Sequence, residues 1–135
     1  MQKDEYDLIV IGAGPVGENV ADRAVQGGLS AVIVERELVG GECSYWACMP
    51  SKTLLRPSAA LEAVRAVPGA AGAVEGGVDV AATLRWRDQI VHEWSDDGQV
   101  GWLESAHIDL VRGHGRLDGE RTVRVTASDG SERLL

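Results

Sequence analysis

The sequence has no long apolar run. Its longest apolar stretches fall far short of the ~18 residues that a membrane-spanning helix needs. It also has no basic N-terminal region followed by an apolar stretch and a small-residue cleavage site, because the polar segment MQKDEYD leads directly into LIVIGAG. These absences argue against a membrane segment and a secretory signal. We therefore predict a soluble, cytoplasmic protein that has no membrane partner.

Positive charge is also scarce. The chain has 13 basic and 21 acidic residues, which gives a net charge of −8 and a pI of about 4.8. Such a chain repels the phosphates of nucleic acids and anionic lipids, so we expect no nucleic-acid partner. A content of 44% hydrophobic and 25% charged residues is ordinary for a globular protein, and 135 residues suffice for one domain with a core.

Cysteine and lysine are rare, and they cluster. Both cysteines, Cys43 and Cys48, and one of the two lysines, Lys52, fall in the stretch GGECSYWACMPSK. In the cytosol, where most thiols stay reduced, a cysteine pair is more often catalytic or metal-binding than structural. This stretch is therefore the first candidate site.

The first 35 residues predict a strand–helix–strand unit. Asp7–Ile11 and Ala31–Glu35 are short, apolar and β-branched, as buried parallel strands are. Between them we predict a helix over Pro15–Gln26, ended by Gly27-Gly28. One face of this helix carries Val16, Val20, Ala24 and Val25.

The turn after the first strand has the pattern G-x-G-x-x-G. Gly12 allows a tight turn, Gly14 lets a pyrophosphate approach the backbone, and Gly17 lets the helix pack on the strand. Glu35 ends the second strand, where a carboxylate can accept hydrogen bonds from ribose hydroxyls. The pattern predicts dinucleotide binding; the alternative is an empty doubly wound fold with a surface glutamate.

Further along the chain, residues 40–67 favour helix, interrupted near Met49-Pro50 because proline lacks a backbone N–H. Residues 70–78 are rich in Gly and Ala and predict a loop. Asp79 can cap a helix over 80–107, with a possible break near 96–98.

The last part of the chain predicts strands. Residues 108–115 favour a strand that enters a glycine turn. Two alternating runs joined around Asp129-Gly130 indicate a terminal β-hairpin.

The spacing of the cysteines requires a distorted backbone if the two are to pair. Five residues of regular α-helix give a rise of ~7.5 Å and a rotation of ~140°, whereas a disulfide needs Cα atoms within about 7 Å. The positive end of a helix also favours the reactive thiolate. Three interpretations stay open: a redox-active pair, a metal site, and two ordinary buried thiols. His92, His107 and His114 show no ligand spacing to the pair, which disfavours a metal.

GGECSYWACMPSK resembles the GG-T-C-x-N-x-G-C-x-P-S-K signature of class I flavoprotein disulfide reductases. This group includes dihydrolipoyl dehydrogenase and the glutathione, mycothiol and mercuric reductases. The resemblance implies that Cys43 is the interchange thiol that attacks a disulfide substrate. It implies that Cys48 is the thiol beside the flavin, and that Lys52 lies near the flavin N5.

The same resemblance implies an FAD site, with the adenine near a glycine turn at His114-Gly115, and no metal. The cofactor-binding residues it implies are Gly12, Gly14, Pro15, Gly17, Glu35, Arg36, Gly41, Glu42, Cys43, Lys52, His114 and Gly115.

The motif departs from the signature at several positions. Glu42 replaces a threonine that helps to hold the pyrophosphate, so we expect its carboxylate to point away and its N–H to serve as donor. Tyr45, Trp46 and Ala47 replace smaller or polar residues. Their bulk would change the access to Cys43 or the shape of the substrate pocket, so the motif does not identify the substrate.

Three tryptophans, Trp86, Trp94 and Trp102, recur at eight-residue spacing, close to two helical turns. We predict core or interface packing for them; the alternative is stacking on a flavin or a substrate.

The predicted fold class is α/β: a Rossmann-like FAD-binding domain with a parallel sheet and a small β-hairpin or meander, incomplete at the C-terminus. Residues 1–135 correspond to the N-terminal part of that domain, without the NAD(P)H-binding and dimer-interface domains of the group.

The predicted function is that of the FAD and redox-active disulfide portion of a homodimeric NAD(P)H:disulfide oxidoreductase acting on a small disulfide or a related substrate. We expect the chain alone to be inactive. The alternative is a non-catalytic flavin- or nucleotide-binding, or redox-sensing, module.

Overall fold

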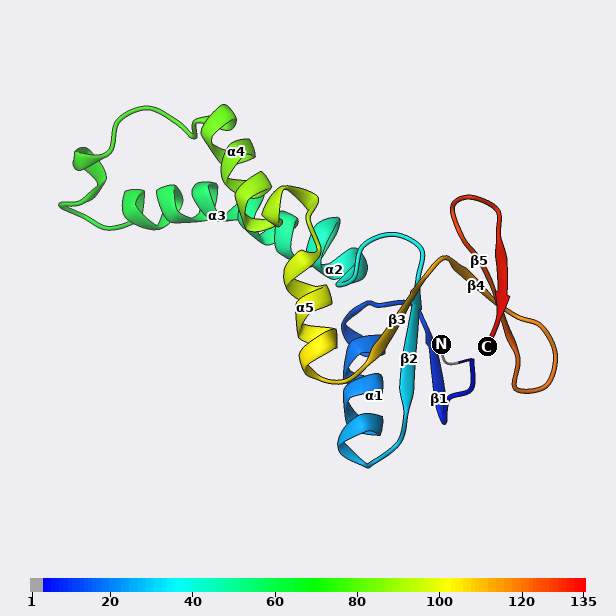
Figure 1. The fold of residues 1–135 in the computed structure, drawn as a ribbon. Helices are drawn as coiled ribbons and strands as arrows, with labels where there is room; N and C mark the ends of the chain where they lie inside the picture. Colours follow the sequence, from blue (N-terminus) through cyan, green and yellow to red (C-terminus); the bar gives the residue numbers. More distant parts are fainter. Residues whose placement is uncertain (1–3) are drawn as a thin grey trace. The chain divides into compact units, whose positions relative to one another are not determined.

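The computed structural model describes residues 4–135. The predicted α/β class is confirmed, since a parallel sheet with helices and a small antiparallel sheet are both present (Figure 1). The described residues form two compact units. The first runs up to Cys43 and resumes at Ser95–Leu135, and the second is Ser44–Trp94.

The first unit contains a parallel three-stranded sheet. Its strands are β1 (Leu8–Ile11), β2 (Ala31–Glu35) and β3 (Asp109–Arg112), with β2 in the middle. Val10 pairs with Ile33, and Ile33 with Leu110. Every residue of β2 is buried, as the sequence predicts, whereas β1 is half-buried and Ile11 is exposed. The prediction of a buried first strand is therefore only partly right, because β1 is an edge strand that pairs with β2 alone.

Helix α1 (Pro15–Gln26) has the predicted bounds, with Pro15 at its first position. Proline starts a helix well because its missing N–H has no acceptor there in any case. Ala21 is fully buried, and Ala24 and Val25 pack against the core. The other two residues of the predicted apolar face, Val16 and Val20, are exposed. The face of α1 that contacts the sheet is thus narrower than the sequence pattern suggests.

The C-terminal part of the first unit is an antiparallel meander of β4 (His114–Leu117), β5 (Val123–Thr126) and β6 (Glu132–Leu134). The predicted hairpin corresponds to β5 and β6, and the sequence analysis missed β4. Val123 and Val125 pack with Val32 and Val34 in one core cluster. Helix α5 (Asp97–Ser105) adds Leu103 to the other cluster, which also holds Ile33.

The second unit is helical. It contains the last two residues of α2 (Gly41–Tyr45), then α3 (Cys48–Arg65), the short 3-10 helix η1 (Ala71–Ala73), α4 (Val80–Ile90) and the single turn η2 (His92–Trp94). Within this unit α3 and α4 lie side by side (Figure 1). Asp79 caps α4 as predicted, because its carboxylate accepts a hydrogen bond from the Ala82 N–H at 2.9 Å.

The helix predicted after Asp79 needs correction. The helix predicted over 80–107 is split into α4, η2 and α5, and the break lies at 91–96, before the predicted position. His92, Glu93 and Trp94 have φ values of 52°, 52° and 58°. A left-handed run of side-chain-bearing residues cannot continue a right-handed helix. The chain therefore reverses its helical sense at this turn.

Among residues 4–135, no helix is both long enough and apolar enough to span a bilayer. The first three residues of the predicted polar N-terminus lie outside the described part of the chain.

Candidate functional site

The turn after β1 is shaped by its glycines. Gly12 has φ +102°, a conformation that favours glycine, and its N–H donates to Val34 O at 2.8 Å. A Cβ added at Gly12 or at Gly14 would meet nothing within 4 Å. The space over these two backbone units is therefore open, as the approach of a diphosphate requires.

Gly17 is packed where Gly12 and Gly14 are open. A Cβ at Gly17 would lie 2.1 Å from Gly12 O and 3.1 Å from Val10 Cγ1. Only a glycine lets α1 approach β1 this closely. The geometry confirms the turn predicted at Gly12 and the close packing predicted at Gly17.

The start of α2 closes the turn from the other side. Gly41 has φ +58°, and a Cβ there would lie 2.9 Å from Gly14 Cα. The Gly40 N–H donates to Ala13 O at 2.7 Å. The two glycine pairs, far apart in sequence, thus lie backbone against backbone within the first unit.

Glu35 is buried and fixes this turn. One carboxylate oxygen accepts from the Ala13 N–H at 2.7 Å, and the other accepts from the Glu37 N–H at 2.8 Å. Each oxygen of a carboxylate can accept a further hydrogen bond. Glu35 therefore holds the turn and keeps acceptor capacity for a ribose hydroxyl.

The N-terminus of α1 points donors at the turn. No side chain caps Gly14, and the first N–H groups of a helix have no intrahelical acceptor. Glu18 follows in the first turn, and burial raises its pKa. One of its carboxylate oxygens is buried without a hydrogen-bond partner among residues 4–135.

The two cysteines lie on different helices. Cys43 is in α2, Cys48 is the first residue of α3, and the helix breaks at Trp46 and Ala47 between them. Ala47 has φ −121° and ψ −92°, well outside the helical region. The distorted backbone that pairing requires is thus present. It lies before the position predicted at Met49-Pro50, since Pro50 sits in the first turn of α3.

The structure shows both cysteines as half-buried thiols. Within the second unit Lys52 follows Cys48 by four residues on α3, so the two side chains share one helix face. Lys52 is exposed there.

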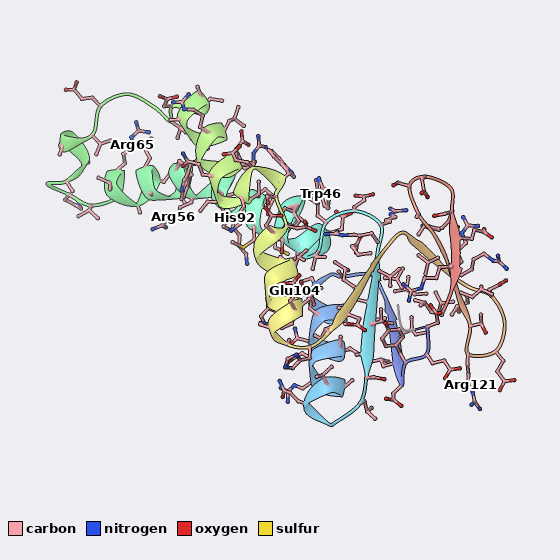
Figure 2. The ribbon with its side chains drawn as sticks, in the orientation of Figure 1. Trp46, Arg56, Arg65, His92, Glu104 and Arg121 are labelled. Atoms are coloured by element: carbon pink, nitrogen blue, oxygen red, sulfur yellow. The ribbon has the colours of Figure 1, made fainter. Side chains whose placement is uncertain are left out.

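The bulky residues between the cysteines differ in burial. Tyr45 is 3% exposed and Trp46 is 44% exposed, with ring centroids 5.7 Å apart. Trp46 is labelled in Figure 2. Glu42 is exposed, and the direction of its carboxylate relative to a diphosphate stays a prediction.

The glycine turn predicted at His114-Gly115 lies one residue earlier. Gly113, with φ +152°, makes the turn, and a Cβ there would lie 2.6 Å from Val125 Cγ1. His114 and Gly115 belong to β4, where a Cβ at Gly115 would lie 3.0 Å from Val34 Cγ1.

The first unit also contains a surface groove of about 500 Å³ beside this turn. It is lined by Arg36, Gly113, His114, Arg116, Arg124, Thr126, Ala127, Ser128 and Glu132. It includes two residues that were predicted to bind a cofactor, Arg36 and His114. Its other charged residues were not anticipated.

The three spaced tryptophans do not form a core. Trp86, Trp94 and Trp102 are 39%, 37% and 39% exposed and belong to three different elements. Core packing, one of the two predicted roles, is therefore wrong, since the single helix that it assumed does not exist; interface packing stays a prediction. The guanidinium of Arg87 lies over the ring of Trp94, 5.2 Å from the ring centroid, in a cation–π contact.

The sequence analysis missed a clasp behind the turn. Asp96 Oδ2 accepts from the Val39 N–H at 2.7 Å and from Arg112 at 2.6 Å, and Arg112 also donates to Glu37 O. The clasp fixes the segment between Glu35 and Gly40. Neither residue stands in a motif, so no sequence signal could have identified them.

Comparison with known proteins decides the family. The family model of the pyridine nucleotide-disulphide oxidoreductases matches residues 6–132. The chain belongs to this family. Its homologues are FAD-dependent and use NAD(P)H.

Curated relatives support this family, and a solved structure shows a similar fold. A dihydrolipoyl dehydrogenase of Chlorobaculum parvum is 37% identical over 97% of this chain and 28% of its own length. A mercuric reductase of Lysinibacillus sphaericus is 30% identical over 95% and 24%. The HOCl-induced flavoprotein disulfide reductase RclA from Escherichia coli, solved as a Cu(II) complex, has a TM-score of 0.76 at 18% identity, covering 98% of this chain and 26% of that one. The chain thus spans between 24% and 29% of the length of the curated relatives.

Proposed function

We propose that this chain is the FAD-binding and redox-cysteine portion of an NAD(P)H:disulfide oxidoreductase. The observation that carries the proposal is the juxtaposition at the Gly12 turn. There an open backbone surface on Gly12 and Gly14 meets Gly41, the residue that starts the cysteine-bearing segment. The family relationship supports the same assignment.

The residues of the turn fit FAD. Gly12 and Gly14 leave room for a diphosphate, and the uncapped start of α1 offers N–H donors and a positive dipole to it. Glu35 would accept from the ribose, with Arg36 beside it. We assign the adenine to the backbone of His114 and Gly115 and the diphosphate also to Pro15, Gly17 and the Glu42 N–H. In such enzymes FAD supplies two-electron exchange between a nicotinamide and sulfur.

The thiols perform the exchange with the substrate. The Cys43 thiolate attacks one sulfur of a disulfide, forming a mixed disulfide and releasing one thiol. Cys48 then attacks Cys43, which forms the Cys43–Cys48 disulfide and releases the second thiol. The two protons of the cysteines end on the two product thiols, so atoms and electrons balance. Lys52 places a positive charge one helical turn after Cys48.

The wider setting of this chemistry is part of the proposal. The substrate is a small disulfide, a lipoyl group or a related electron acceptor such as a metal ion or a quinone. We infer a homodimeric, cytoplasmic enzyme in which the nicotinamide site lies outside residues 1–135. The isolated chain should therefore show no disulfide-dependent NAD(P)H oxidation.

The test is Cys48→Ser in the protein that carries this chain with its nicotinamide domain. We expect disulfide-dependent NAD(P)H oxidation to fall by about 1000-fold or more, as for loss of an essential nucleophile, while FAD stays bound. The matched control is Ser58→Ala, an exposed position on the same helix, which should keep full activity. Activity that survives in Cys48→Ser would contradict the proposal, because it would show that turnover does not pass through Cys48. FAD binding without any disulfide-dependent oxidation in the wild type would support the alternative, a flavin-binding module with idle or redox-sensing cysteines.

A further inference from the structure

The outer face of the meander gathers polar and charged side chains. In the strand register Arg116 lies opposite Arg124, and Thr126 lies between His114 and Glu132. Successive side chains of a strand alternate between faces. Because Val123 and Val125 are buried on the inner face, Arg124 and Thr126 belong to the outer one. The groove of about 500 Å³ lies against this outer face. Arg36, directly after β2, adds a third guanidinium, which is paired with Glu37 at 3.4 Å.

The two central arginines differ in what they contact. Arg124 donates to Asp118 and to Glu132, each at 2.6 Å. Arg116 makes no hydrogen bond or ion pair with any other residue of the described chain 4–135. Like charges directly opposite each other on antiparallel strands destabilise a sheet. Arg124 is thus neutralised by two carboxylates, whereas Arg116 presents a guanidinium that no carboxylate of residues 4–135 pairs with.

The rest of the groove supplies neutral donors. Thr126 and Ser128 line it, and within residues 4–135 their hydroxyls have no hydrogen-bond partner. An arginine fork with nearby hydroxyls is the donor set that suits a phosphate group, because guanidinium matches two phosphate oxygens at once. Among the lining residues three are cationic and one, Glu132, is anionic. Glu132 is already paired with Arg124.

We propose that this groove binds the phosphate of a small soluble phosphomonoester, with Arg116 as the main ligand. Arg124 is the second cation, and Thr126 and Ser128 donate from their hydroxyls. The site goes beyond the proposed function, since Arg116, Arg124, Thr126 and Ser128 are not among the residues assigned to FAD. Only the Arg36 and His114 end adjoins the proposed adenosine position.

The experiment is calorimetric titration of the FAD-loaded protein with ribose 5-phosphate, at constant ionic strength, with ribose as the matched ligand that lacks phosphate. We expect saturable binding of the phosphate ester and none of ribose. Arg116→Gln should weaken binding about tenfold, the loss of one charge-assisted contact. The control is Arg121→Gln, since Arg121 lies in the β4–β5 loop with its side chain 90% exposed (Figure 2), and this variant should bind as the wild type does.

Three results would overturn the proposal: non-saturable heat, equal affinity of Arg116→Gln and wild type, or binding of ribose 5-phosphate only when FAD is removed. The last result would make the groove part of the cofactor site. Arg116→Gln should fold normally because Arg116 has no partner in the described chain, and its thermal unfolding midpoint checks this. FAD content is measured on the same samples, so a failure here is distinguishable from a failure of the proposed function.

Discussion

The two units of the molecule differ in where they hold their apolar side chains. Both core clusters, around Ile33 and around Val34, consist of residues of the first unit. The second unit buries Tyr45, Pro50, Thr53 and Val91 but exposes many large apolar residues. Those exposed residues are Trp46, Met49, Leu54, Leu55, Val64, Val67, Val78, Val80, Leu84, Trp86 and Trp94.

The two units also hold different parts of the candidate site. The first unit holds the glycine turn, Glu35 and the sheet that positions them. The second unit holds Cys48 and Lys52 at the start of α3, and its last turn is left-handed at three consecutive residues. Left-handed conformations cost about 1 kcal/mol or more for each such residue. We infer that the first unit supplies most of the folding free energy and that the second depends on it.

The largest expected effect is therefore in the first core. Ile33→Ala removes a fully buried side chain from the central strand and should lower the free energy of unfolding by about 4 kcal/mol. Leu55→Ala in α3, where Leu55 is 69% exposed, should change it by less than about 0.5 kcal/mol. Urea denaturation measures both. Similar losses in the two variants would break the comparison, because they would give the second unit a core of its own.

The glycines of the turn sharpen the comparison within the first unit. Gly17→Ala forces a Cβ to within 2.1 Å of Gly12 O, and should cost about 3 kcal/mol. Gly14→Ala meets no atom within 4 Å and should cost about 1 kcal/mol or less, the difference between helix N-caps. Gly14→Ala should nevertheless weaken FAD retention. Equal stabilities in guanidinium titrations would show that α1 does not pack on β1 through Gly17.

The Asp96 clasp gives the next effect. Asp96→Ala leaves the Val39 N–H and Arg112 without their common acceptor and should cost about 2 kcal/mol. The control Asp97→Ala removes an exposed carboxylate next to it in sequence and should cost about 0.5 kcal/mol. Thermal unfolding of the two variants tests this. Matching midpoints would mean that the clasp does not hold the segment after Glu35.

Glu18 gives the smallest effect and a pH signature. Burial raises its pKa above the ordinary 4.5, so folding disfavours the carboxylate, and stability falls as the pH rises above that value toward the pKa of the folded protein. At pH 7 Glu18→Gln should raise the free energy of unfolding by about 1 kcal/mol. At pH 4 the gain should vanish. A gain independent of pH would show that charge burial is not its cause.

The sequence predicts the first strand–helix–strand unit closely. The bounds of α1 and β2 follow from Pro15, from the Gly27-Gly28 stop and from a β-branched run. The cap at Asp79 follows from its side chain alone. These features are local, so the sequence contains what is needed to predict them.

What the sequence does not predict depends on contacts between distant segments. The Gly113 turn is fixed by Val125 and Thr126, and the approach of Gly41 to Gly14 needs both loops in place. Pro57 lies inside α3, where local rules predict a break. The left-handed turn at 92–94 contains no glycine, so the sequence gives no signal that predicts it. In the candidate site the glycines and cysteines have sequence patterns, whereas Asp96, Arg112, Arg116 and Arg124 have none.

The central claim is that the glycine turn and the cysteine segment serve one flavin. The most direct measurement is the absorption spectrum of the FAD-loaded protein after partial reduction. A thiolate against the flavin gives a long-wavelength band, which we expect in the wild type and in Cys43→Ser but not in Cys48→Ser. Bound FAD without any such band, or the same band in Cys48→Ser, would contradict the account.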